Sequence, residues 1–249
     1  RRAKLTREIF DAELAAGING YYLADTFMQG GADDTLKRDK VLTPAREQFE
    51  KLAKGPPTSR TVWIARAWAA EVLGDQGNPT GMISEFNAIL KIPRLEAEDG
   101  KRLVGFFKVR REYLQALADN NPVQLSAVEQ KLRLWLGRYG TMQKPPPEVI
   151  AIRFYLAFVL QRQGMISSKG GTVVPLPGTA RQQFEIAEKL YRALSQTDHD
   201  YTDRSAKNRM FVVRRLLGEA DKSVMEYPTF EAAQMAALIQ MAKRNDTEQ

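Results

Sequence analysis

The only histidine of this 249-residue chain, His199, lies among three aspartates at positions 198, 200 and 203. Carboxylates beside an imidazole can bind a metal ion or relay a proton. However, the group falls between two segments that we expect to be helical, where aspartate and threonine are common helix caps. We therefore interpret the cluster as capping residues. With one histidine and no cysteine, the sequence also excludes disulfides, cysteine nucleophiles and metal sites built from several histidines or thiolates.

A second candidate is the stretch Ser167–Thr172, which reads SSKGGT. A phosphate-binding P-loop has the pattern GxxxxGK(S/T) between a strand and a helix. Here the lysine precedes the glycines, and no predicted strand leads into the stretch. We interpret residues 165–178 as a flexible insertion. Because no nucleophile is paired with a base, we expect a protein without catalytic residues, metal or cofactor.

Clusters of cations on two predicted helices are the strongest candidates for a binding site. On the second helix the cations fall within about a third of the circumference at 3.6 residues per turn, and we expect Met210, Val213 and Leu217 to anchor it while the arginines face outward. Such a stripe would bind an acidic peptide, a lipid headgroup or a nucleic acid. The alternative is a solvated basic face. The candidate partner-binding residues are Lys101, Lys108 and Arg111 on the first helix, and Arg204, Lys207, Arg214 and Arg215 on the second.

The elements that carry these residues are clearest in Val62–Pro93, which we interpret as two helices joined by a turn. Apolar residues recur three and four positions apart in both halves. Gly74 is expected to end the first helix, and Pro93 to end the second. The predicted buried residues are Trp63, Ala67, Ala70 and Leu73 in the first helix, and Met82, Phe86 and Ile89 in the second.

The same periodicity predicts about ten helices and no strand, and therefore an all-α fold. Gly30–Lys40 is predicted to be a loop, with Thr43 as a cap and Pro44 at the first position of the next helix. Gly164 is expected to end its helix. Outside the hairpin, helices are predicted at Lys4–Gln29, Thr43–Lys54, Glu96–Ala118, Val123–Arg138, Glu148–Gln163, Thr179–Ser195, Tyr201–Glu219 and Thr229–Lys243.

Three of the predicted helices share one pattern: a small or apolar residue, an aromatic residue four positions on, and an apolar residue three positions after that. The matches are Ala45–Phe49–Leu52, Met82–Phe86–Ile89 and Ala187–Tyr191–Leu194. Pro57 and Pro93 follow the first two. This pattern resembles the tetratricopeptide repeat, in degenerate form, since the spacing is longer and less regular than the family's roughly 34 residues. Coat-like and HEAT-like helical arrays remain open alternatives.

The resemblance implies an α-solenoid of about five antiparallel helix pairs, which we expect to form one domain over residues 1–249. It also implies a non-enzymatic scaffold that binds a peptide or protein. The net charge of +7 favours an acidic partner. The alternative is a solenoid that uses its basic helices on nucleic acid or an anionic membrane. No apolar run has the roughly 18 residues of a membrane span. Because the chain begins with Arg1, we expect it to be part of a longer protein or a processed chain. Its compartment is left open, with the cytoplasm slightly favoured.

Overall fold

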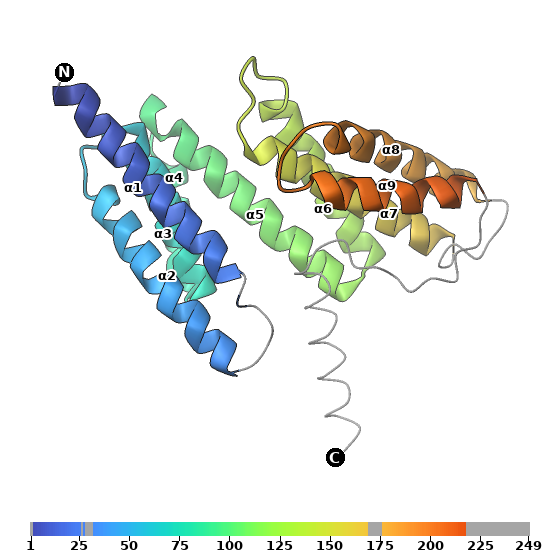
Figure 1. Cartoon of the computed structure of the whole chain (residues 1–249), viewed down its shortest axis with the longest axis horizontal. Coiled ribbons are helices and arrows are strands. Elements are labelled where there is room, and N and C mark those ends of the chain that lie inside the picture. The colour runs from blue at the N-terminus through green and yellow to red at the C-terminus, as the bar shows by residue number, and fades with distance from the viewer. Residues whose placement is uncertain (1, 26, 28–31, 169–175, 218–249) are drawn as a thin grey trace. The chain divides into compact units, whose positions relative to one another are not determined.

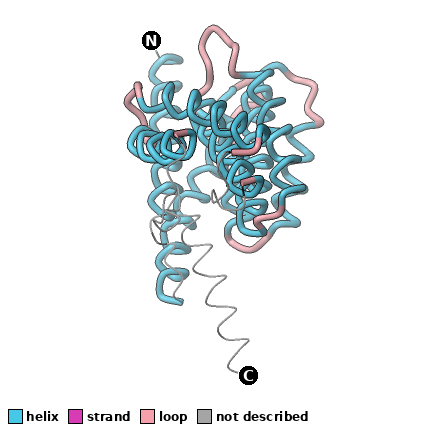
Figure 2. The backbone as a smooth tube through the Cα atoms, turned by 90° about the vertical axis from the view of Figure 1, so that its right-hand side faces the viewer, coloured by secondary structure: helices cyan, strands magenta, loops and turns pink. Residues whose placement is uncertain are grey.

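The computed structural model describes residues 2–25, 27, 32–168 and 176–217, and all regular structure in those residues is helical. Figures 1 and 2 show helices joined by loops, with no strand in this part of the chain. The predicted all-α fold is therefore confirmed. The helices are α1 (Arg2–Asp25), α2 (Ala32–Ala53), α3 (Arg60–Asp75), α4 (Pro79–Leu90), a 3-10 turn η1 (Leu95–Ala97), α5 (Glu98–Asp119), α6 (Pro122–Tyr139), α7 (Glu148–Ser167), α8 (Gly178–Ser195) and α9 (Thr202–Leu216).

The chain divides into two compact units, Arg1–Phe107 and Lys108–Gln249, and the boundary falls within α5. Within each unit, helices that follow one another along the chain pack together. In the first unit α1 contacts α2, α2 contacts α3, and α3 contacts α4; in the second, α6 contacts α7, α7 contacts α8, and α8 contacts α9. That these two units behave as one domain stays a prediction.

The central hairpin forms as the sequence predicts, with one change at its turn. The side chain of Asn78 caps α4, because its Oδ1 accepts a hydrogen bond from the backbone N–H of Gly81 at 2.9 Å. Helix α3 continues through Gly74 to Asp75. The residue with left-handed backbone is Gly77, whose φ of +85° suits a residue without a Cβ. The predicted role of Gly74 is thus played by Gly77.

Trp68 is the centre of the first unit's core. Its ring lies 5.0 Å from that of Tyr21, 5.9 Å from that of Phe49 and 4.8 Å from that of Phe107, measured between centroids. Trp68 lies on α3, and the three rings around it come from α1, α2 and α5. The indole therefore packs where four helices meet. At Gly100, the start of α5 runs so close to α3 that a Cβ would lie 2.7 Å from the carbonyl oxygen of Trp63.

The predicted loop over Gly30–Lys40 is wrong from Ala32 onward, because α2 begins there and contains Pro44 in its interior. Polar contacts hold this part of the helix in place. Arg38 forms an ion pair with Asp75 at 3.2 Å, and its guanidinium also donates to the backbone carbonyl of Asp75. Leu42 is fully buried. These contacts outweigh the hydrogen bond that a proline removes from a helix interior.

Helix α7 is the core helix of the second unit. By length and apolar composition it is the one helix in the described residues that could cross a membrane, but 78% of its most apolar stretch is buried inside the protein. Gly164 lies within α7 instead of ending it. A Cβ at this position would lie 2.9 Å from the ring of Phe184 on α8. The glycine therefore allows close helix packing, and the prediction that it ends the helix is wrong.

The prediction of a flexible insertion over residues 165–178 is contradicted at its two ends, where the structure has helix. Residues 165–167 form the end of α7, and α8 begins at Gly178. Residues 169–175 lie outside the described residues, as does the predicted helix Thr229–Lys243.

Candidate functional site

The structure confirms that Arg204, Lys207 and Arg214 are exposed on α9, but it buries Arg215. Arg215 is 5% exposed, and its guanidinium lies 5.0 Å from the ring centroid of Phe211. This geometry is a cation–π contact, which lowers the cost of burying the charge. Arg215 thus belongs to the interior of the second unit, and its prediction as a partner-binding residue on an outward stripe is corrected.

The predicted anchor of α9 is also wrong, since Met210 is 60% exposed and Leu217 is 72% exposed. The face that packs inward carries Ser205, Asn208, Val212 and Arg215. The helix is therefore rotated relative to our expectation, which assumed that the apolar residues must point inward.

Hydrogen bonds between side chains account for this rotation. Asn208 is buried and donates through Nδ2 to the hydroxyl of Tyr191 at 3.4 Å, and that hydroxyl donates to Gln161 at 2.8 Å. The three side chains link α9, α8 and α7. Because most buried polar groups in proteins are hydrogen-bonded, these hydrogen bonds favour the orientation of α9 that turns Asn208 inward.

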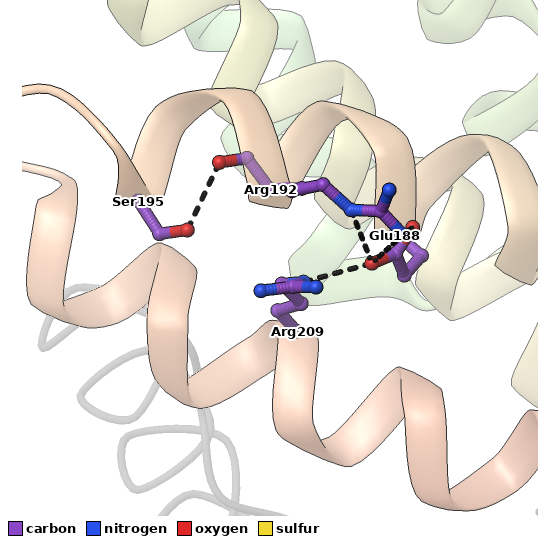
Figure 3. A network of polar contacts seen from close by, with 4 residues as sticks. All are labelled: Glu188, Arg192, Ser195 and Arg209. Atoms are coloured by element: carbon purple, nitrogen blue, oxygen red, sulfur yellow. Dashed lines mark hydrogen bonds and ion pairs between the residues drawn. The ribbon is translucent and has the colours of Figure 1, made fainter.

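An ion-pair cluster fixes the same interface from its edge (Figure 3). The carboxylate of Glu188 on α8 has only 8% of its side chain exposed. Arg192 donates to it from Nε at 3.0 Å and from Nη2 at 2.9 Å, and Arg209 of α9 donates from Nε at 2.8 Å. Burial raises the pKa of Glu188, but the hydrogen bonds and charges of the two arginines outweigh this effect and bring the pKa below its usual 4.5.

This lowered pKa predicts an acid-dependent loss of stability. A carboxyl whose pKa is lower in the folded state contributes stability above its unfolded pKa of about 4.5 and loses that contribution as the pH falls through its folded value. We expect Glu188→Gln to lower the urea midpoint at neutral pH, with a difference from the unaltered protein that shrinks in acid. The control is Glu185→Gln one turn earlier, since Glu185 forms an exposed ion pair with Arg181 and such pairs contribute little. Equal midpoint changes for both variants at neutral pH would contradict the assignment.

With α9 oriented in this way, its outward face combines cations with large apolar side chains. We call this face the outer α9 surface and define it as Arg204, Lys207, Met210, Arg214 and Leu217. Among the described residues, neither Arg204 nor Arg214 forms a hydrogen bond or an ion pair. Ala206 and Val213 share the face of Met210 and Leu217 by helical spacing. The surface therefore offers an apolar stripe with unpaired positive charge beside it.

The predicted residues of α5 differ from those of α9 in their surroundings. Lys101 belongs to the first unit and forms an ion pair with Glu98 at 2.7 Å, with 18% of its side chain exposed. Arg102 beside it pairs with Asp99 at 3.4 Å. Lys108 and Arg111 belong to the second unit, where both are half-buried. Glu98 and Asp99 thus neutralise part of the positive charge of α5 from which the sequence predicted a binding site.

The segment around His199 is a turn organised by its own side chains. The ring Nδ1 of His199 accepts from the backbone N–H of Tyr201 at 3.1 Å, and the hydroxyl of Thr202 accepts from the N–H of His199 at 3.0 Å. Tyr201 precedes α9 at the capping position, without a capping hydrogen bond from its side chain. In the described residues no three His, Asp or Glu side chains are grouped so that they could hold a metal ion.

Comparison with known proteins finds no matching family model, no similar curated sequence and no similar solved structure. The function must therefore be inferred from the geometry of the chain itself.

Proposed function

We propose that this chain is a non-enzymatic protein-interaction scaffold whose helices stack as an α-solenoid, and that it binds an acidic, partly apolar protein segment on the outer α9 surface. The stacking of successive helices within each unit supports the solenoid. So do the aromatic residues of the repeat pattern, because Phe49, Phe86 and Tyr191 are all fully buried, as the resemblance implies.

The observation that carries the proposal is the exposure of Met210 and Leu217 beside the unpaired Arg214, with a second unpaired arginine, Arg204, near the start of α9. Exposed large apolar side chains grouped on one face mark interaction sites more often than scattered ones do. Arginine guanidinium groups bind carboxylates through two parallel hydrogen bonds. A partner that places leucine-like side chains over the stripe and glutamates beside it would satisfy both features.

The same surface suggests a second candidate, an anionic membrane, because basic and apolar residues also alternate on helices that lie at a lipid surface. Nucleic acid fits less well. Proteins that bind single strands stack bases on aromatic side chains, whereas the large apolar residues of this surface are methionine and leucine.

A binding measurement with paired charge reversals tests the proposal. The probe is a labelled synthetic helical peptide of 15 residues, with glutamate along one face and leucine along the other. We expect Arg204→Glu combined with Arg214→Glu to weaken its binding by at least about tenfold, because two favourable contacts become repulsive and each 1.4 kcal/mol is worth a factor of ten. Fluorescence anisotropy gives the affinity, and circular dichroism verifies the fold.

The matched control is Lys144→Glu combined with Lys189→Glu, which changes the net charge equally at two other exposed positions of the second unit. Equal affinity for both double variants would overturn the proposed surface. If instead the unaltered chain binds phosphatidylserine vesicles, ignores the peptide and loses vesicle binding only in the α9 variant, then the membrane candidate is correct.

A further inference from the structure

The cluster of Glu188, Arg192 and Arg209 carries more positive charge than its carboxylate neutralises. Two arginines share one glutamate, so the three side chains have a net charge of +1. Arg209 uses only its Nε in the cluster, and Arg192 uses its Nε and Nη2. In the part of the chain that the structure describes, Nη1 of Arg192 and both Nη atoms of Arg209 have no hydrogen-bond partner. Figure 3 shows these nitrogen atoms turned away from the carboxylate.

Both guanidinium groups are held in place and remain accessible. The side chain of Glu188 is only 8% exposed, whereas those of Arg192 and Arg209 are 53% and 38% exposed. Because the buried carboxylate fixes the two guanidinium groups, little side-chain freedom is lost when a further anion binds to them. Arginine also presents its N–H donors as a flat fork, which matches the two oxygens of a carboxylate. The free edges of this cluster are therefore suited to bind a carboxylate of another molecule.

The same cluster borders the apolar stripe of α9. Residues four apart are offset by about 40° around a helix with 3.6 residues per turn. Arg209, Val213 and Leu217 follow one another at that offset, and Arg214 follows Met210 in the same way. Residues seven apart, such as Met210 and Leu217, lie on the same face. The stripe therefore has Arg209 on the side that faces α8 and Arg214 on the opposite side.

We propose that Arg192 and Arg209 form a second anion-binding border of the outer α9 surface, and that the partner is a helix with carboxylates on both sides of its apolar stripe. This inference rests on the function proposed above and defines the class of partner more closely. Where two helices pack along an apolar seam, charged residues on either side of the seam form ion pairs between the helices and select the partner. Arg214 lies in such a position on one side of the stripe, and Arg209 with Arg192 on the other.

Two labelled helical peptides with the same leucine stripe test the second border against the full chain. One has glutamate on both sides of the stripe, and the other has glutamate on one side and glutamine on the other. By fluorescence anisotropy we expect the two-sided peptide to bind about three- to tenfold more tightly, since an exposed ion pair contributes up to about fivefold and two arginines are available. Arg192→Gln and Arg209→Gln, made singly so that Glu188 keeps one arginine, should each reduce this advantage by at least about twofold. The control is Arg133→Gln on α6, which removes the same charge from an arginine that also donates from Nε to a glutamate four residues earlier; it should leave the advantage unchanged.

The ratio of the two affinities for one variant does not depend on the fraction of folded molecules, so a loss of stability in an arginine variant leaves the comparison valid. Equal affinities of the two peptides for the unaltered chain would overturn the second border. So would an advantage that persists undiminished in both arginine variants, or one that falls equally in Arg133→Gln. In these three cases the proposed function stands as long as the one-sided peptide binds. If neither peptide binds, the proposed function is wrong and the second border is wrong with it.

Discussion

Tyr191→Ala is expected to destabilise the protein by roughly 3–5 kcal/mol, the range for removing a large buried aromatic side chain. Tyr191 is fully buried, and its ring lies 5.9 Å from that of Phe154. The substitution leaves a cavity between α7 and α8. It also removes the hydroxyl that links Gln161 to Asn208, so that two buried amides lose a partner. Urea unfolding followed by circular dichroism measures the change in the free energy of unfolding.

Tyr191→Phe separates the hydroxyl from the ring. This substitution keeps the packing of the ring but leaves the two buried side-chain amides without the hydroxyl as a hydrogen-bond partner. We expect the free energy of unfolding to fall by about 1–3 kcal/mol. Burial also raises the pKa of Tyr191 well above its usual 10.0. The neutral phenol therefore contributes stability below its unfolded pKa and loses it as the pH rises through the folded value. The difference between Tyr191→Phe and the unaltered protein should shrink in strong alkali. A Tyr191→Ala midpoint equal to that of the unaltered protein would show that this side chain does not bridge the helices.

The parts of the fold that could be predicted from sequence are those where apolar spacing alone decides the packing. In α6 the predicted residues Leu125 and Leu132 are fully buried, and in α8 so are Phe184 and Tyr191. Helix α8 has one apolar stripe and a polar opposite face, so only one orientation buries the stripe. Helix α6 buries its predicted stripe as well, although Val123 and Leu134 are exposed on it. The central hairpin was predictable for the same reason, with a proline and an asparagine marking its turn.

The missed features are those in which polar side chains decide the structure. The start of α2 is held by the ion pair between Arg38 and Asp75, whose residues are 37 apart in the sequence. No local pattern can reveal such a contact. Pro44 after Thr43 also looked like a helix start, although a proline can be accommodated in a helix whose tertiary contacts are strong.

Helix α9 shows why the candidate site was only partly predictable. The cations were found because their spacing places them on one side, but the direction of that side depends on partners from α8. Asn208 and Arg209 bind Tyr191 and Glu188, and those contacts turn Met210 and Leu217 outward. In an array of helices, an apolar residue can face the helix that follows its own helix in the chain as readily as the helix that precedes it. The exposed stripe was therefore visible in the sequence, but its direction was not.

Phe86→Ala is expected to cost roughly 3–5 kcal/mol in the first unit, as Tyr191→Ala does in the second. Phe86 is fully buried on α4, and its ring stacks on that of Phe107 with 6.2 Å between centroids and 12° between planes. Removing the ring leaves a cavity between α4 and the part of α5 around Phe107, which neighbouring helix backbones cannot close easily. Urea unfolding again measures the effect.

The matched control is Ile83→Ala, one turn earlier on the same helix, where the side chain is 50% exposed and truncation should change the unfolding midpoint little. Comparing the unfolding curves of Phe86→Ala and Tyr191→Ala then tests the prediction that the two units form a single domain. Because α5 continues across the boundary between the two units, one cooperative transition should shift in both variants. Two separate transitions, each sensitive to only one substitution, would show that the units unfold independently. An unchanged midpoint for Phe86→Ala would show that its ring does not pack between the helices as the repeat pattern requires.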